Sequence, residues 1–396
     1  MIGMIKNIND VTCAFLQEFD LLCFSHLRWS FVFQRPHHLL TRFAKHQRVF
    51  FFEEPVFTKT KEKLQIENYN KNLYIVTPHL PEGLKEDEVI KKQQQLVSHL
   101  VTTMNIDRHI CWYYTPMAVP FTNHLQPEIV VYDCMDELSA FKFASPDLKL
   151  REQLLFKKAD VVFTGGQSIY ESKKDAHHNI HSFPSSIDKQ HFGKARSIKD
   201  DPADQQQIPH PRFGFFGVLD ERFDIDLVKR VAEEKPDWHF VFIGPVVKID
   251  PASLPQGKNI HYLGGKKYDE LPQYIAGWDI ATIPFAINES TRFISPTKTP
   301  EYLAAGKPVI STPIKDVVSP YGEKKLVHIA GKAEEFIKAA EAELKKKRKS
   351  TWLKKVDEFL AFHSWDKTWS QMVRQIEAIY IQNELAKSKT KGKAYV

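Results

Sequence analysis

Residues 295–312 read Ser-Pro-Thr-Lys-Thr-Pro-Glu-Tyr-Leu-Ala-Ala-Gly-Lys-Pro-Val-Ile-Ser-Thr, and this stretch does most to decide the fold. Its polar, proline-containing start predicts a loop, its middle a short helix over 299–305, and its end a strand over 309–311. Lys298 and Glu301 stand three residues apart, near the start of that helix and on one face. Free N–H groups at a helix start, together with a lysine, suit a diphosphate, and a glutamate one turn further suits the hydroxyls of a ribose. The same residues also fit an ordinary helix–strand junction that ends at a glycine and leaves both charges in solvent.

The length and composition limit the class of protein that this chain can be. A chain of 396 residues with 42% hydrophobic and 26% charged residues has the balance of a globular protein and the length for two domains. No run approaches the roughly 18 apolar residues of a membrane span, and we expect a cytoplasmic protein. A net charge of +6 is too small to require a nucleic-acid partner. The basic block 345–349 is interpreted as a solvated face, with peripheral contact to an anionic membrane as the alternative.

Short apolar runs alternate with amphipathic stretches along the whole chain. This alternation predicts an α/β protein with two Rossmann-like, doubly wound units, each a mostly parallel sheet covered on both faces. Strands are expected at 20–24, 49–52, 73–76, 109–113, 129–132, 161–164, 212–216, 239–243, 260–262, 280–284, 309–311 and 326–329. Helices are expected at 37–45, 85–104, 149–159, 224–234, 268–276, 299–305 and 365–386.

A break in this alternation predicts the domain boundary. Residues 193–211 are rich in Lys, Asp, Gln and Pro and are interpreted as the linker. The predicted units are therefore 1–205, 206–362 and a C-terminal helix and tail, 363–396, that packs back on the first unit. In such folds the binding site lies at the carboxyl ends of the strands, so we expect it in the cleft between the two units.

Metal-binding patterns are weak in this sequence. The four cysteines have no C-x-x-C spacing and are interpreted as free thiols. Asp224 and Asp226 form an Asp-x-Asp triplet, but they open an amphipathic stretch and are better interpreted as helix-capping acids. We therefore expect no metal site.

The order of these features resembles the GT-B glycosyltransferases, in particular the bacterial family-four-type (group 1) enzymes of surface polysaccharide or teichuronic-acid-like biosynthesis. The resemblance rests on 295–312, on the linker and terminal helix, and on the stretches 28–39, 132–137, 163–166 and 364–366. It implies transfer of a sugar from a nucleoside-diphosphate donor, a UDP-sugar, to a surface polysaccharide or lipid-linked glycan, without a cofactor or metal. It also implies a place in the cytoplasm or at the inner face of the plasma membrane. A nucleotide-sugar epimerase and a non-catalytic nucleotide-sugar-binding protein are the alternatives.

The candidate donor-binding residues lie in the second unit. Arg222 follows the first strand of that unit, where the resemblance implies a cation for the donor phosphates; a surface pair with Glu221 or Asp224 is the alternative. The full predicted set is Gly217, Arg222, Gly244, Gly264, Ser295, Thr297, Lys298 and Glu301.

The candidate catalytic residues follow a strand of the first unit. Asp136 is expected to act as general base or to orient the acceptor, and Asp133 is a second candidate; both also fit turn and cap positions. Gln34 and Arg35 open the first helix, where Arg35 faces an anionic acceptor or the donor phosphates, or else forms a salt-bridged helix start.

One residue departs from the pattern of the resembled family. Its usual motif has a second glutamate eight residues before the position of Glu301, and this chain has Phe293 there. The contact to the transferred sugar is then either lost or supplied by another residue, such as Asn288, Glu289, Thr291 or Arg292.

Overall fold

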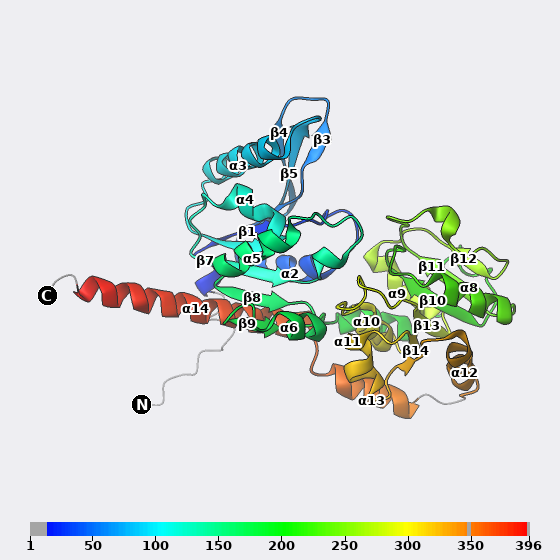
Figure 1. Cartoon of the computed structure of the whole chain (residues 1–396). Helices are drawn as coiled ribbons and strands as arrows, with labels where there is room; N and C mark the ends of the chain where they lie inside the picture. The colour runs from blue at the N-terminus through cyan, green and yellow to red at the C-terminus, as the bar shows by residue number, and fades with distance from the viewer. Residues whose placement is uncertain (1–13, 347–349, 394–396) are drawn as a thin grey trace, which may run out of the picture.

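Two sheets, one in each half of the chain, organise the computed structural model, which describes residues 14–346 and 350–393 (Figure 1). The strands of the first sheet run in the order β3-β5-β2-β1-β6-β7-β8-β9, and β4 pairs with β5. Their bounds are β1 Asp20–Phe24, β2 Val49–Phe52, β3 Val56–Thr58, β4 Lys63–Asn70, β5 Leu73–Pro81, β6 His109–Tyr113, β7 Ile129–Cys134, β8 Val161–Thr164 and β9 Ile180–Ser182.

The second sheet is parallel throughout and has the order β12-β11-β10-β13-β14-β15. Its strands are β10 Arg212–Phe216, β11 His239–Ile243, β12 Ile260–Tyr262, β13 Ile280–Ile283, β14 Val309–Ser311 and β15 His328–Ile329. All twelve of the expected strands are present, so the predicted α/β, doubly wound fold is confirmed.

Helices connect the strands of both sheets. In the first half they are α2 Arg35–Phe43, α3 Glu86–Thr103, α4 Val119–Thr122, α5 Leu148–Lys158, α6 Gln167–Lys173 and α7 Lys189–Gly193. In the second half they are α8 Ile225–Glu234, α9 Leu271–Ala276, α10 Lys298–Ala304, α11 Lys315–Val317, α12 Ala333–Leu344, α13 Ser350–Leu360 and α14 Trp365–Lys393. Residues 347–349 of the basic block lie outside the described residues.

The first sheet is buried on both faces. Along β2, Phe51 packs into the core on one face, whereas Phe50 and Phe52 pack into the core on the other. Side chains of a strand alternate between the faces, so a doubly covered strand needs an unbroken apolar run. Helix α14 supplies part of the first of these cores, through Trp365, Met372, Val373 and Ile376. Figure 1 shows it running along the first domain, as the sequence predicts for the terminal helix.

Both edges of the first sheet differ from the prediction. Strands β3, β4 and β9 were not expected, and β4 runs antiparallel to β5. All eight side chains of β4 are exposed or half-buried, and this strand lacks the continuous apolar run that marks its neighbours.

The chain passes from one domain to the other earlier than the predicted linker. Phe183 packs against the first core, whereas Ile187 already lies in the core of the second domain. Ala195 and Ile208, inside the stretch interpreted as a linker, are also buried in that second core. The crossing therefore falls within 183–187, and the polar segment that follows packs on the second domain.

Side chains also connect the domains directly. The Phe33 ring stacks on the Tyr268 ring, with centroids 4.1 Å apart. Asp316 accepts a hydrogen bond of 3.0 Å from the backbone N–H of Ser168, at the start of α6, and so caps a first-domain helix from the second domain. These contacts hold the carboxyl ends of the two sheets face to face.

Candidate active site

A cavity of about 1250 Å³ lies between the two domains, at the carboxyl ends of their strands. Loops after β1, β2 and β7 and part of β4 line its first-domain side, and loops after β10, β11, β12 and β13 with the start of α10 line the other. This volume exceeds the range of about 300–1,000 Å³ typical of a site for one small ligand, so two reactants have room here. Parallel α/β domains bind ligands at this edge of the sheet.

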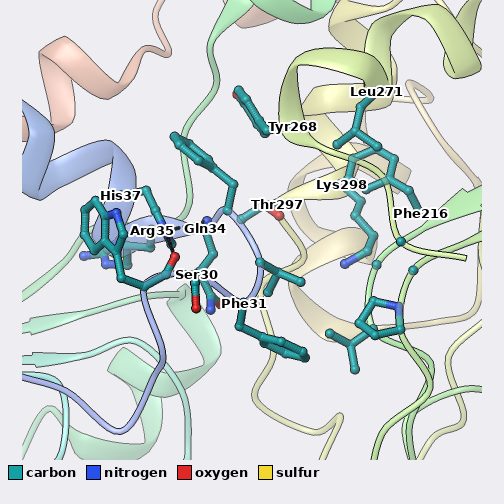
Figure 2. A pocket seen from close by; sticks show the side chains of 18 of the residues that line it. Ser30, Phe31, Gln34, Arg35, His37, Phe216, Tyr268, Leu271, Thr297 and Lys298 are labelled. Carbon is teal, nitrogen blue, oxygen red and sulfur yellow. Dashed lines mark hydrogen bonds between the residues drawn. The ribbon is translucent and has the colours of Figure 1, made fainter. Parts of the chain in front are cut away.

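The start of α10 supplies two charged side chains to the cavity. Figure 2 shows the Lys298 side chain pointing into it. Burial, and then the positive charge of Arg222, lower the pKa of Lys298. Glu301 is only 5% exposed and its Oε2 has no hydrogen-bond partner among the described residues. Burial raises the pKa of this carboxyl, against the opposing effect of Lys298. An unpaired buried carboxylate is costly, so this one is suited to accept hydrogen bonds from a ligand.

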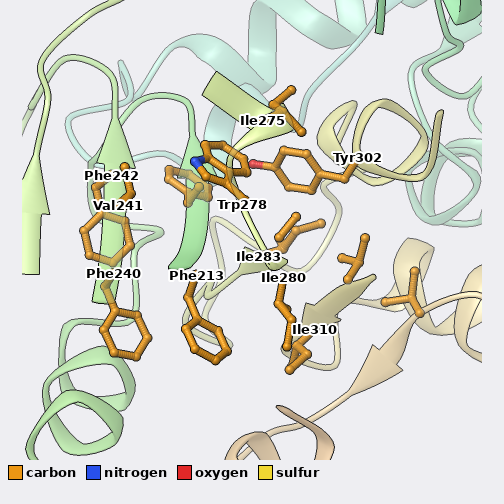
Figure 3. Close-up of a cluster of buried hydrophobic side chains, with 14 of the residues drawn as sticks. Phe213, Phe240, Val241, Phe242, Ile275, Trp278, Ile280, Ile283, Tyr302 and Ile310 are labelled. Carbon is orange, nitrogen blue, oxygen red and sulfur yellow. The ribbon is translucent and has the colours of Figure 1, made fainter. Parts of the chain in front are cut away.

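Packing of the second domain fixes α10 in place. Tyr302 is fully buried and its hydroxyl accepts a hydrogen bond of 3.0 Å from the backbone N–H of Phe216, at the end of β10. Figure 3 shows Tyr302 beside Trp278 within the aromatic core, and their ring centroids lie 5.8 Å apart. The Trp278 ring needs a glycine at 214, because a Cβ there would lie 1.8 Å from it. Gly214 therefore serves the packing of this core.

Two glycines let the second-domain loops approach Lys298. Gly217 has φ +141°, and a Cβ at this position would lie 2.3 Å from Lys298 Cε and 2.7 Å from Nζ. A Cβ at Gly244, which has φ +143°, would lie 1.9 Å from the Gly217 carbonyl oxygen. Gly264 accepts a hydrogen bond of 2.9 Å from the Gly244 N–H but does not line the cavity. Of the eight expected donor-side residues, the other seven line it: Gly217, Arg222, Gly244, Ser295, Thr297, Lys298 and Glu301.

Arg222 faces the cavity and is paired with an acid at the same time. Its Nε and Nη2 donate to the Asp220 carboxylate at 2.9 Å and 2.6 Å. The partner is Asp220 rather than Glu221 or Asp224, the residues named as alternatives. Asp220 is buried and anchors the guanidinium at the cavity wall. Arg222 and Lys298 thus face the same cavity, which Arg35, Lys266 and Lys267 also line.

Asp136 and Asp133 have different surroundings. Asp136 lines the cavity, and burial raises its pKa to about 6, against the opposing charges of Arg222 and Arg35. Asp133 is fully buried and does not line the cavity. Its carboxylate accepts from Arg35 Nε at 3.0 Å and from Nη2 at 2.9 Å. This pairing corrects the catalytic role expected of Asp133.

The start of α2 also carries a residue that stabilises the fold. Arg35 is 2% exposed, and besides Asp133 it donates to the Phe183 carbonyl oxygen at 2.7 Å. Arg35 thus forms the salt-bridged helix start, one of its two interpretations, and it also lines the cavity. Gln34 precedes α2 and lines the cavity, and its backbone N–H donates to His37 Nδ1 at 3.1 Å.

Comparison with known proteins agrees with this geometry. Residues 210–346 match the family model described as "Glycosyl transferases group 1". The chain contains a group 1 glycosyltransferase domain. Its β10–β15 sheet and α10 fall in the matched segment.

One curated relative and several solved structures extend the likeness beyond the group 1 domain. The "Putative teichuronic acid biosynthesis glycosyltransferase TuaH" of Bacillus subtilis (strain 168) is 25% identical over 242 residues, which are 56% of this chain and 60% of that protein. The match thus spans less than two thirds of the relative.

The solved structures show the fold. One, "Trehalose-6-phosphate from E. coli bound with UDP-2-fluoro glucose", has a TM-score of 0.66 at 11% identity, covering 91% of this chain and 99% of that one. Anabaena Alr3699/HepE in complex with UDP and glucose has a TM-score of 0.65 at 13% identity, covering 90% and 99%. The architecture is GT-B, with its C-terminal helix returning to the first domain.

Phe293 of the group 1 domain points away from the cavity. It packs against a core of the first domain and is not among the residues that line the site. Its neighbour Ile294 is the residue that lines the cavity. At the position of the usual glutamate, this chain therefore has an apolar contact between domains.

Several lining residues were not expected from the sequence. On the first-domain side they include Trp29, Glu53, Glu67, Asn68 and Tyr69. Glu53 orders the loop after β1 by accepting from the Trp29 N–H at 2.8 Å and from Arg28 Nη1 at 3.0 Å. The cluster of aromatic residues in that loop was a usable signal, whereas Glu67 to Tyr69 lie on β4, which was itself missed. In the part of the chain that the structure describes, no group of three His, Cys, Asp or Glu side chains is arranged to hold a metal ion.

Proposed function

We propose that this protein transfers a sugar from a nucleoside-diphosphate donor, a UDP-sugar, to the hydroxyl of a surface polysaccharide or lipid-linked glycan. The observation that carries the proposal is the start of α10, where the Lys298 amine and the unpaired, buried Glu301 carboxylate share one cavity. A diphosphate supplies the negative charge that a site with several cations favours, and ribose hydroxyls supply the donors that Glu301 lacks. Two proteins of similar fold bind UDP or a UDP-sugar, which supports a uridine donor.

The charges of the cavity suit the chemistry of transfer. The bond between the anomeric carbon and the diphosphate oxygen breaks, and its electron pair leaves with the diphosphate. Lys298 and Arg222 stabilise that developing charge, without a metal ion, because they are held in place before the reaction begins. An oxygen of the acceptor hydroxyl forms the new bond to the anomeric carbon, and its proton passes to Asp136. With a pKa of about 6, Asp136 is ionised at neutral pH and retains useful basicity.

The domains divide the substrates between them in this proposal. The second domain holds the donor, and the first domain, with its aromatic loop after β1, receives the acceptor. Of the helices that the structure describes, none is both long and apolar enough to cross a membrane. In this proposal the protein meets a lipid-linked acceptor at the inner face of the plasma membrane and is held at its surface.

A panel of nucleotide sugars tests the proposal directly. Diphosphate release that depends on an added glycan acceptor supports transfer. An isomerised donor would instead show an epimerase, and thermal stabilisation by UDP without turnover would show a binding protein.

Variants then test the residues. Lys298→Ala and Glu301→Ala should each weaken UDP binding by roughly tenfold or more, from the loss of one charge-assisted contact. Lys338→Ala, an exposed position on α12, is the matched control and should bind as the wild type does. Unchanged UDP affinity in both α10 variants would remove the donor assignment. Asp136→Asn should lower turnover and leave UDP affinity intact, and a normal rate would place the base elsewhere.

A further inference from the structure

Three exposed apolar side chains lie on α5 and on the loop that precedes it in the first domain. Phe143 is 80% exposed, and Leu150 and Leu154 on α5 are 61% and 45% exposed. The two leucines are four residues apart on a helix, so they share one face, while α5 buries Leu148, Leu155 and Phe156 on its other side. Single exposed apolar residues are common, but three grouped on one loop and the helix that follows it indicate a binding surface.

The backbone at Phe143 gives a second, independent observation. Its φ is +65°, a left-handed conformation that a bulky residue rarely adopts. The ring that this conformation presents is not buried against the rest of the chain. Unfavourable backbone geometry without any gain in packing is typical of a functional position.

Lysines surround these apolar side chains. Three lysines here are exposed and form no ion pair among the described residues: Lys142, Lys149 and Lys157. The nearby acids Asp147 and Glu86 are both paired with Arg151. We call this surface the α5 patch: Lys142, Phe143, Lys149, Leu150, Leu154 and Lys157.

The patch adjoins the candidate active site. The Lys142 N–H donates to Glu221 Oε1 of the second domain at 3.3 Å. The Phe141 ring lies 5.5 Å from the Arg222 guanidinium carbon, at the cavity wall. A surface that bound the α5 patch would therefore lie next to the entrance of the cavity.

We propose that the α5 patch docks on an anionic phospholipid bilayer. Exposed aromatic and aliphatic side chains enter the headgroup boundary, and the lysines meet the negative surface of the lipid. The other exposed apolar pair on a long helix, Ile381 and Leu385 on α14, is less suited because Glu384 lies between them. This inference rests on the proposed function, which places the protein at the membrane surface, and vesicle binding tests it separately from sugar transfer.

Vesicle sedimentation with the full chain tests the proposal. The wild type should sediment with vesicles that contain phosphatidylglycerol, sediment less with pure phosphatidylcholine, and be released by salt. The triple variant Phe143→Ser, Leu150→Ser, Leu154→Ser should bind the anionic vesicles at least about tenfold less. Replacing Lys142, Lys149 and Lys157 by Gln should weaken binding and flatten its salt dependence.

A matched variant controls for general loss of surface apolarity. Phe362→Ser, Ile381→Ser, Leu385→Ser removes three exposed apolar side chains elsewhere and should bind as the wild type does. Thermal unfolding checks that each variant is folded. Equal binding of the wild type and the patch variant, or an equal loss in the control, would overturn the proposal. So would self-association that the patch variant abolishes, because the patch would then cover a second copy of the chain.

Discussion

Replacing Gly217 by alanine tests whether Lys298 meets the diphosphate. The added Cβ would lie 2.3 Å from Lys298 Cε and 2.7 Å from Nζ, far inside normal contact. The end of a lysine is flexible, so the overlap is relieved by moving the ammonium group about 1 Å or more, and the protein still folds. We expect the position of the charge to change rather than the fold.

Gly217→Ala should have two separate effects, one on UDP binding and one on stability. A hydrogen bond to a charged group contributes about 1.5–3 kcal/mol, so losing it should weaken UDP binding by roughly 10- to 150-fold. The backbone contributes a second effect, because alanine at φ +141° should lower the free energy of unfolding by about 1–3 kcal/mol. Calorimetric titration with UDP measures the first effect and urea unfolding the second.

Gly264→Ala is the matched control. This glycine also has a positive φ, +69°, but a Cβ there has no atom within 4 Å, and Gly264 does not line the cavity. It should lose stability by a similar amount and keep its UDP affinity. If the Gly217 and Gly264 variants bind UDP equally well, Lys298 does not hold the diphosphate and the reasoning fails.

Three other predictions concern the remaining charged groups. Turnover should fall about tenfold per pH unit below pH 6, because Asp136 must be ionised to accept a proton and its pKa is raised to about 6. Initial rates across pH measure this fall, and the inflection should vanish in Asp136→Asn. Glu301→Gln should bind UDP more weakly yet discriminate less between UDP and 2′,3′-dideoxy-UDP, and undiminished discrimination in a competition assay would count against a ribose contact. Arg35→Ala should lower the free energy of unfolding by about 3–5 kcal/mol, because it leaves Asp133 buried and unpaired. Arg42→Ala removes a pair with the exposed Asp366 and should lower it by under about 1 kcal/mol. Similar urea midpoints for the two variants would contradict this.

The central strands were predictable because both of their faces are buried. A strand such as β2, Val49–Phe52, must then be apolar at every position, and such runs are visible in the sequence. Strand β4 has polar, largely exposed residues at most positions, so nothing distinguishes it from a loop until β5 pairs with it. Because β4 was not predicted, the lining residues Glu67 to Tyr69 were not predicted either.

The site was predictable where local sequence determines it. Lys298 and Glu301 are placed by one turn of α10, so their spacing alone brings them together. Arg35 and Asp133 are 98 residues apart, and the choice between a reactive and a paired arginine depends on a contact that spacing cannot show. Arg222 has several acids within four residues, and only the conformation of the loop selects Asp220.

The return of α14 to the first domain means that this domain is encoded by two separate stretches of the gene. Residues up to about 183 build its sheet, but Trp365, Met372, Val373 and Ile376 complete one of its cores. A premature stop near residue 362 would leave the sequence of the second domain nearly intact and remove packing from the first. Truncation should therefore damage the half of the protein that lies farthest from the lesion along the chain, and a first domain expressed alone would require α14 to be grafted back.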